Sequence, residues 1–414
     1  MALYDLRKQV HSLSVVSNMC FGLKETPEKL QEFATQTVTG VMAIKGNIRK
    51  LKPSTKELLG DYKPVWGPVV WSNKDQGANT VCDNNMFLAY WEEKNRYVLA
   101  IAGTNINSLY GWFVEDFQTG IMVDWTEVSP GAPSSSGKIA LGTSKGMDAL
   151  INKMVDGDKG TIMDFLKKQM ATATPGASLS VGGHSLGGTL TPVMATYLLN
   201  TKDTWDPKGN VSSINAYPTA GATPGNGTFA SYVESLFGGE NEYYGEYNPI
   251  DVVPHGWQAD MMAKVPTLYA DFKNGIPKPK LIALAVQAAL LMTKGKNYQQ
   301  ITPFHALELV KYIAIPEADV QKAMDKIPKA VKAVFTALGL SLENHLKFMI
   351  ELGIQHVTAY SDWMLGIESF CVELYQPYLK EHKPSTATAM EDAAAESIAS
   401  LASSYKEQAE GVEA

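Results

Sequence analysis

The chain has 414 residues, 45% of them hydrophobic and 19% charged, and its formal net charge is −7. This composition is typical of soluble globular proteins, and the length allows one large domain or two ordinary ones. Segment 381–414 carries seven acidic and two basic residues, so the rest of the chain is close to neutral. No basic surface for nucleic acid is therefore expected.

The cysteines and the N-terminus limit the class of protein further. Cys20, Cys82 and Cys371 are widely spaced and form no C-x-x-C pair, so we expect buried thiols and neither a disulfide framework nor a zinc site. The N-terminus lacks the charged start and long apolar core of a signal peptide, which predicts a cytoplasmic location, although a secreted form without its leader would look the same. The apolar run 281–292 is shorter than the ~20 residues of a membrane span, so no transmembrane segment is predicted.

The first part of the chain is predicted to combine helices, strands and loops. We expect a helical flank over 1–60 and a loop or edge strand over 66–80, which is rich in Gly, Pro and Asn. Two apolar runs, 86–91 and 97–102, are joined by five polar residues and predict a hairpin. Three further segments follow: an aromatic-rich loop at 106–125, a Gly/Pro/Ser-rich loop at 129–137 and a broken helix at 139–170.

Strand and helix patterns alternate through the middle of the chain. Strands are predicted at 177–182, 211–217 and 241–247, and helices at 189–199 and 228–236. This alternation predicts an α/β fold, with a mostly parallel sheet covered by helices.

After Asp251 the pattern becomes helical, with almost no strand signal. Apolar residues recur at helical spacing within 327–338 and 342–350, and a last helix is predicted from 357 to about 378. Residues 384–414 are rich in Ala, Ser, Thr and Glu, so we expect this acidic tail to be disordered or weakly helical.

The most informative motif is Gly183-His184-Ser185-Leu186-Gly187, which fits the G-x-S-x-G nucleophile elbow. A serine on a sharp strand-to-helix turn brings neighbouring backbone close on both sides, so glycine is needed two positions before and after it. The required context is present, since a strand is predicted before the motif and a helix after it. Ser185 is therefore the candidate nucleophile.

The serine hydroxyl needs two partners to react at neutral pH. An imidazole must take its proton, and a carboxylate must orient the imidazole. In hydrolases built on this elbow, the acid and then the histidine follow the serine along the chain. Asp251 lies in a turn after a later predicted strand and is the candidate acid.

Five histidines follow Asp251: His255, His305, His345, His356 and His382. His255 is too close to Asp251 in sequence to face the same serine, and His382 lies beside the tail. His356 is the candidate base, because Gly353 is expected to end one helix and the next is expected to begin near 357, leaving His356 on an exposed connection. His345 falls inside a helical pattern and stays as the alternative.

An oxyanion formed during acyl transfer needs two backbone N–H donors. One is expected from Leu186, the residue after the nucleophile, and the other from the loop after an early strand. Thr104 follows the strand predicted at 97–102 and is the candidate for that second donor.

Together these motifs resemble the class 3 lipases of the α/β-hydrolase superfamily, which are triacylglycerol lipases and related esterases. Four matches stand in the family's order: Ala102-Gly103-Thr104 like its strand closing in R-G-[ST]; 183–188 as its G-H-S-L-G-G elbow; 217–229 like its P-R-x-G-N-x-x-F block with an insertion; and 248–254 like its N-x-x-D-x-V-P turn. The resemblance covers roughly 87–254 and the region of His356.

By this resemblance, Ser185 is the nucleophile, Asp251 the orienting acid, His356 the base and Thr104 an oxyanion residue. The chain also departs from the family's pattern. Ala102 stands where an arginine is usual, and Leu141-Gly142-Thr143 stands where H-x-G-F is frequent. The largest departure is the long helical insertion before His356.

We expect an α/β-hydrolase fold with a mostly parallel central sheet, an N-terminal helical flank and a helical insertion before the catalytic histidine. The predicted units are the flank 1–60, the core 61–254, the insertion and candidate cap 255–352, the core completion 353–383 and the acidic tail 384–414.

The predicted function is that of a serine carboxylic-ester hydrolase, a lipase or esterase that acts through an acyl-enzyme on medium- to long-chain esters such as acylglycerols. No metal or cofactor is required, because the triad activates its own nucleophile. The insertion and four aromatic residues, Tyr110, Trp112, Phe113 and Phe117, are expected to form an apolar lid or acyl pocket with transient lipid contact. The alternatives are acyl transfer or thioester hydrolysis on the same triad, a purely structural helical subdomain, and a non-catalytic scaffold.

Overall fold

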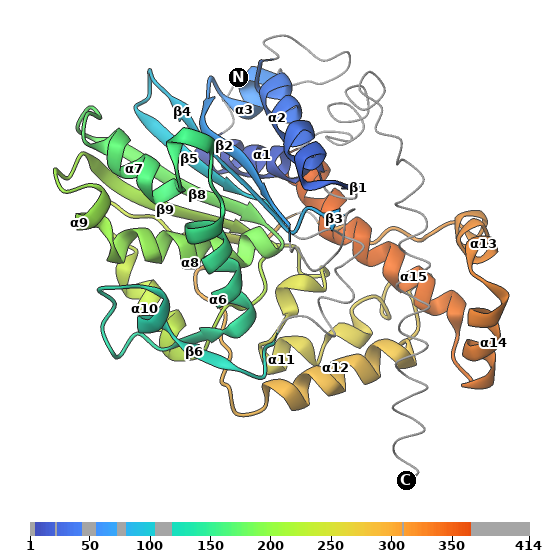
Figure 1. Cartoon of the computed structure of the whole chain (residues 1–414). Helices are drawn as coiled ribbons and strands as arrows, with labels where there is room; N and C mark the ends of the chain where they lie inside the picture. Colours follow the sequence, from blue (N-terminus) through green and yellow to red (C-terminus); the bar gives the residue numbers. More distant parts are fainter. Residues whose placement is uncertain are drawn as a thin grey trace.

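The structure, a computed structural model, describes residues 5–20, 23–43, 55–72, 80–103, 118–308 and 310–365. Its centre is a seven-stranded sheet with helices on both faces (Figure 1). The strands are β2 (Lys63–Trp71), β4 (Asn84–Trp91), β5 (Arg96–Ile101), β8 (Ala177–His184), β9 (Val211–Thr219), β10 (Gly245–Tyr247) and β11 (Phe304–Ala306). Two small sheets pair β1 (Lys24–Glu25) with β3 (Thr80–Val81), and β6 (Met122–Asp124) with β7 (Lys138–Ala140).

The central sheet has the order β11-β10-β9-β8-β5-β4-β2. Strands β5, β8, β9, β10 and β11 are parallel to one another, whereas β4 pairs antiparallel with both β5 and β2. The predicted mostly parallel sheet and the hairpin of β4 and β5 are therefore confirmed. The predicted nucleophile elbow lies at the end of β8, in the middle of the sheet, between β5 and β9.

The sheet is buried because side chains alternate between two apolar layers. Leu88, Leu99 and Val181 point into a core on the first face of the sheet, while Phe87 and Val98 point into a core on the second face. The helices on the first face are α5 (Trp125–Val128), α6 (Leu141–Asp148), α7 (Ile162–Met170), α8 (Leu186–Asn200), α9 (Lys202–Trp205) and α10 (Gly227–Leu236). Those on the second are α1 (Leu6–Ser17), α2 (Pro27–Ala43) and α3 (Thr55–Leu59).

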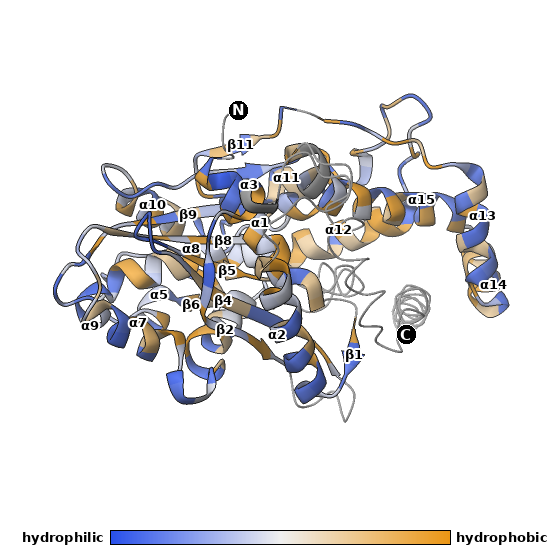
Figure 2. Ribbon diagram, turned by 90° about the horizontal axis from the view of Figure 1, so that it is seen from above, coloured by the Kyte–Doolittle hydropathy of each residue, from blue (hydrophilic) through white to orange (hydrophobic). Residues whose placement is uncertain are grey.

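The chain beyond Asp251 adds helices at one end of the molecule (Figure 1). They are α11 (Ala259–Met262), α12 (Lys280–Thr293), α13 (Glu317–Lys326), α14 (Lys329–Ala337), α15 (Leu342–Gly353) and the π-helical segment η8 (Ile354–Met364), with short 3₁₀ turns η6 (Val253–His255) and η7 (Val265–Thr267). α12 is mostly apolar along its length (Figure 2). It packs on Trp257, Tyr269 and Phe348, and the same apolar cluster includes Ala140 and Ala222 from the part of the chain that precedes Asp251.

Three predictions in this part of the fold need correction. The insertion supplies an edge strand, β11, which pairs with β10 although its three residues carry too little periodicity to be recognised. The broken helix predicted at 139–170 divides into α6, the π-helical segment η4 (Ala149–Lys153), the 3₁₀ turn η5 (Gly157–Lys159) and α7, preceded by β7. The third correction concerns His356 and is described with the site.

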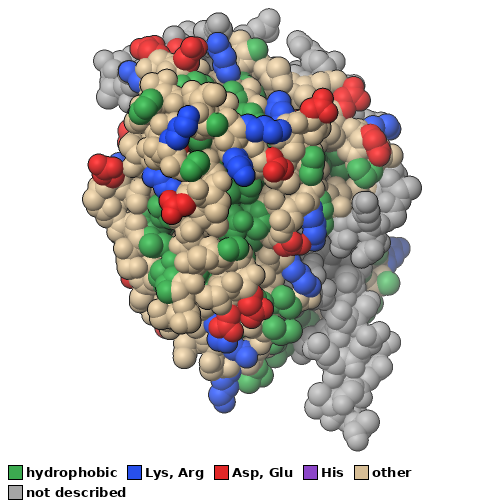
Figure 3. Space-filling view, turned by 60° about the vertical axis from the view of Figure 1, so that its left-hand side comes forward, with side chains coloured by type: hydrophobic (Ala, Val, Ile, Leu, Met, Phe, Trp, Pro, Cys, Tyr) green, Lys and Arg blue, Asp and Glu red, His purple; other side chains and the backbone are tan. Residues whose placement is uncertain are grey.

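Other expectations agree with the structure or lie outside it. Cys20 and Cys82 are free thiols and both are buried. Cys371, the acidic tail and most of the aromatic-rich loop lie outside the described residues. None of the described helices is both long and apolar enough to cross a membrane. On the face seen in Figure 3, acidic and basic side chains are interspersed.

Candidate active site

Ser185 lies at the sharp turn between β8 and α8, as the elbow motif predicts. Its backbone has φ 64° and ψ −123°, a strained conformation for a residue with a side chain. A Cβ atom on Gly183 would collide with the backbone of Gly187, and one on Gly187 would collide with the carbonyl of Ile101. The motif's two glycines are therefore required by close backbone packing. The Ser185 side chain is 3% exposed, and its Oγ has no hydrogen-bond partner among the described residues.

Asp251 and His356 form a buried pair. His356 Nδ1 lies 2.8 Å from Asp251 Oδ2, and the two side chains are 1% and 0% exposed. Asp251 is fixed by two further donors: the Tyr360 hydroxyl at 2.9 Å and the N–H of Val253 at 3.1 Å. The carboxylate favours the tautomer with a proton on Nδ1, which leaves Nε2 as an acceptor. His356 Nε2 is buried without a partner among the described residues, so it is available to take a proton.

The position of His356 corrects the sequence prediction. Gly353 was expected to end a helix, but α15 runs directly into η8, with Ile354 in helical conformation (φ −62°, ψ −50°). Instead of occupying an exposed connection, His356 is buried within this helical segment. Tertiary contacts outweigh the glycine's preference, because His356 and Tyr360, four residues apart, both bond to Asp251. The wider π turn belongs to a class of distortion that is frequent at functional sites.

A second cluster of histidines lies behind His356. The centroids of the His184 and His356 rings lie 4.7 Å apart. The Nδ1 atoms of His11 and His184 both lie within hydrogen-bond distance of Thr219 Oγ1, at 3.1 and 3.2 Å. The Thr219 hydroxyl donates to the Gly183 carbonyl, so it accepts from both rings and each carries its proton on Nδ1.

Burial keeps both of these rings neutral. It lowers the pKa of His11 to about 4, and burial together with the neighbouring His356 and His11 lowers the pKa of His184 well below its ordinary value. His11 and His184 therefore place no fixed positive charge beside His356. Sequence reasoning missed His11, because an isolated histidine in an N-terminal helix carries no local signal of a contact with Thr219.

The oxyanion candidates are described only in part. Leu186 is the first residue of α8, so its N–H has no acceptor within the helix. Thr104 lies outside the described residues, as do the four aromatic candidates Tyr110, Trp112, Phe113 and Phe117. Among the described residues, no cluster of three or more His, Cys, Asp or Glu side chains is arranged to hold a metal ion.

Comparison with known proteins agrees with this geometry. The family sequence model for lipase (class 3) matches residues 98–260, which span β5, the elbow and Asp251. Residues 98–260 are thus identified as a class 3 lipase sequence. The chain is accordingly a carboxylic-ester hydrolase of the triacylglycerol-lipase type, with an ester or lipid as substrate. Comparison with curated protein sequences gives no match.

Solved structures share the fold. The crystal structure of M37 lipase superposes with a TM-score of 0.65 at 23% identity, over 91% of this chain and 99% of that one. A lipase from Rhizopus microsporus var. chinensis gives a TM-score of 0.39 at 16% identity, over 62% of this chain and 70% of that one. The first similarity shows that this chain has the α/β-hydrolase fold, and that the likeness in fold extends over most of the helical insertion.

The lipase's other histidines are placed elsewhere. His255 Nδ1 lies 2.7 Å from the backbone carbonyl of Asp251, and the ring of His305 on β11 stacks on Tyr244 with centroids 3.9 Å apart. His382 lies outside the described residues. None of these contacts involves the Asp251 carboxylate, which His356 occupies.

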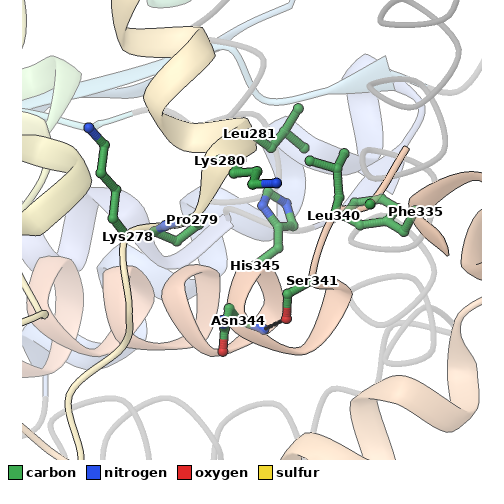
Figure 4. Close-up of a pocket in the computed structure, with 10 residues that line it drawn as sticks. Lys278, Pro279, Lys280, Leu281, Phe335, Leu340, Ser341, Asn344 and His345 are labelled. Carbon is green, nitrogen blue, oxygen red and sulfur yellow. Dashed lines mark hydrogen bonds between the residues drawn. The ribbon is translucent and has the colours of Figure 1, made fainter. Parts of the chain in front are cut away.

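His345, the alternative base, belongs to a different site. It lies on α15 against a cavity of about 150 Å³ between the start of α12 and the loop before α15 (Figure 4). Lys280, Leu281, Phe335 and Leu340 surround its imidazole (Figure 4). Neither Ser185 nor Asp251 lines this cavity, so the structure brings His356 and not His345 to the acid.

We predict that His345 makes the lipase sensitive to acid. Burial lowers the pKa of His345 to about 4, whereas the unfolded chain titrates near 6.5, so between these values only the unfolded chain binds the proton. The free energy of unfolding should therefore fall as the pH falls, by about 2 kcal/mol from this group between pH 7 and pH 5. Urea unfolding of wild type and His345→Leu at both pH values should show a shallower pH dependence in the variant. Parallel pH dependences would contradict the assignment.

Proposed function

We propose that this class 3 lipase cleaves carboxylic esters with Ser185 as nucleophile, His356 as general base and Asp251 as orienting acid. The observation that carries the proposal is the buried Asp251–His356 pair, whose free Nε2 lies within the same group of rings as His184, the residue next to Ser185. The order of the three residues along the chain is that of hydrolases built on the nucleophile elbow.

The reaction would proceed through an acyl-enzyme. His356 Nε2 takes the proton of the Ser185 hydroxyl as Oγ attacks the ester carbonyl, and the N–H of Leu186 and a donor from Thr104 stabilise the oxyanion. His356 then protonates the departing alcohol. A water molecule, deprotonated by His356, attacks the acyl-enzyme, and the acid leaves as Ser185 recovers its proton.

Asp251 orients the His356 imidazole and stabilises the positive charge that forms on it. The imidazolium formed in each step is stabilised by the buried carboxylate 2.8 Å away, while Tyr360 and Val253 keep that carboxylate in place. Acyl transfer to another alcohol or thioester hydrolysis would use the same acyl-enzyme. Acyl transfer is distinguished from hydrolysis by the ratio of transfer product to hydrolysis product in the presence of a primary alcohol. The intact elbow and acid–histidine pair favour catalysis over a scaffold role.

We further propose that the insertion covers the active site and favours medium to long acyl chains. Leu186, directly after the nucleophile, packs against the apolar cluster that includes residues of α12. Tyr298 donates to the carbonyl of Thr119, which belongs to the described end of the aromatic-rich loop. The opposite face of α12 exposes Leu284, Leu291 and Met292, with Leu291 72% exposed. An apolar layer of this kind suits acyl chains and a lipid surface.

This proposal predicts that initial rates rise with acyl length. On p-nitrophenyl esters from acetate to palmitate, kcat/KM should increase towards octanoate or beyond, because each buried methylene stabilises the transition state by up to ~0.8 kcal/mol. Trp112→Ala tests the sequence-predicted pocket and should lower kcat/KM more for the octanoate than for the acetate. Fastest turnover of acetate, with equal effects of Trp112→Ala at all lengths, would mean a short-chain esterase with a purely structural insertion.

A further inference from the structure

The C-terminal end of α1 lies against the strand end that enters the active site. Asn18, the C-cap of α1, accepts a hydrogen bond from the N–H of Gly103 through Oδ1 at 2.8 Å. Its Nδ2 donates to the carbonyl of Ser14 at 2.6 Å, one turn back in the helix. Both polar atoms of the Asn18 side chain are thus hydrogen-bonded, and this side chain links α1 to Gly103.

Gly103 is packed directly on the nucleophile. A Cβ atom added to Gly103 would lie 2.6 Å from the carbonyl oxygen of His184, 2.9 Å from Ser185 Cβ and 3.3 Å from Asn18 Oδ1. The backbone of Gly103 is therefore sandwiched between the Asn18 amide and the elbow. Movement of Gly103 away from Asn18 would change its distance from Ser185.

A second contact shows how specific the role of Asn18 is. Asn85 donates from Nδ2 to the carbonyl of Ser17 at 2.7 Å, and its own carbonyl accepts the N–H of Ala102 at 2.8 Å. Asn85 thus links Ala102, at the end of β5, to α1, and this link does not involve the Asn18 side chain. Only the next N–H, that of Gly103, depends on the Asn18 side chain.

We propose that Asn18 is a positioning residue for ester hydrolysis, which fixes the Gly103 backbone against Ser185 at the oxyanion side of the site. This inference rests on the proposed function of Ser185. Because the Gly103 N–H is occupied by Asn18, it is not itself an oxyanion donor. Asn18 acts through the placement of the chain that leads from β5 towards the nucleophile, and such placement matters because small displacements in an active site lower the rate strongly.

The chain offers a closely matched control in the neighbouring residue. Ser17 is fully buried, and its Oγ donates to the carbonyl of Ser14 at 2.6 Å, the acceptor that Asn18 also uses. Ser17→Ala therefore removes one hydrogen bond from the same turn of α1 but leaves the bond from Gly103 to Asn18 in place. A general loosening of α1 would affect Ser17→Ala and Asn18→Ala alike.

The test compares the full-length wild type, Asn18→Ala and Ser17→Ala on p-nitrophenyl octanoate. Asn18→Ala should lower kcat by about 10- to 100-fold with KM little changed, because a misplaced site loses transition-state stabilisation rather than substrate binding. The inhibition constant of an alkyl trifluoromethyl ketone, which forms a tetrahedral oxyanion with the serine, should rise by the same factor. Ser17→Ala should keep wild-type kcat and inhibitor affinity while showing a comparable shift of unfolding midpoint.

Two results would overturn the inference: wild-type kcat in folded Asn18→Ala, or equal losses of kcat in both variants. The proposed function is tested separately by wild type and Ser185→Ala. Suppose that wild type hydrolyses the ester and Ser185→Ala does not. Wild-type kcat in Asn18→Ala would then contradict the role of Asn18 but not that of Ser185. If Ser185→Ala retains full activity, the role of the nucleophile itself is wrong.

Discussion

Ser185→Ala is expected to lower kcat for ester hydrolysis by ~10⁴-fold or more, the scale for loss of a triad member, while the fold stays intact. The Ser185 Oγ has no hydrogen-bond partner among the described residues, so its removal leaves no buried group newly unpaired. The strained backbone of the elbow is tolerated equally by alanine. The variant should also fail to react with a p-nitrophenyl phosphonate, which labels an activated serine.

Ser180→Ala is the matched control for this experiment. Ser180 lies on the same strand, β8, is fully buried, and its Oγ likewise has no partner among the described residues. Removing its hydroxyl should leave both hydrolysis and phosphonate labelling at wild-type levels. A Ser185→Ala protein that keeps even a tenth of wild-type activity would show that another group is the nucleophile.

The parts of the site that could be predicted from the sequence are those fixed by local sterics. Gly183 and Gly187 are required because backbone passes within contact distance of both, and this requirement is visible as a motif. The turn that holds Asp251 is similarly local, since Asn248 and Asp251 bond to backbone within the same few residues. Local motifs therefore predict the elbow and the turn, and Ser185 and Asp251 as the candidate residues within them.

The environment of His356 could not be predicted, because it depends on contacts between distant segments. Asn248 donates to the carbonyl and the side chain of Gln355, and the Tyr360 hydroxyl accepts from the N–H of Asn248, so the helix is continued by partners about 110 residues away. The helix-ending preference of Gly353 is worth only ~1 kcal/mol and is outweighed by these buried bonds.

The same reason explains why α1 was predicted only as a flanking helix. The amphipathic pattern of the N-terminal region predicts a helix, but it does not show which partner each buried polar side chain meets. His11 reaches Thr219, 208 residues away, and Asn18 reaches Gly103, 85 residues away. A helix that the sequence places outside the core therefore supplies two hydrogen bonds to the immediate surroundings of Ser185.

The second large effect is expected from His356→Asn. An asparagine can keep the hydrogen bond to Asp251 Oδ2 through its amide N–H, so the buried carboxylate is not left without its partner. It lacks any group that could accept the serine proton. We therefore expect a loss of kcat of ~10⁴-fold, similar to that of Ser185→Ala, with a small change in the unfolding midpoint.

His345→Leu distinguishes the two histidines of the last helical segment. His345 is as buried as His356 but lines the separate cavity beside Lys280 and Phe335, so its substitution should alter the acid stability of the protein and leave kcat near the wild-type value. Both variants should be assayed at pH 8, where His345 is neutral in the folded and unfolded chain and its titration does not affect the amount of folded enzyme. Activity in His356→Asn together with inactivity in folded His345→Leu would reassign the base. Loss of activity in His356→Asn alone would agree with the contact that the structure shows between His356 and Asp251, and would make the π-helical segment, rather than a loop, the carrier of the catalytic base.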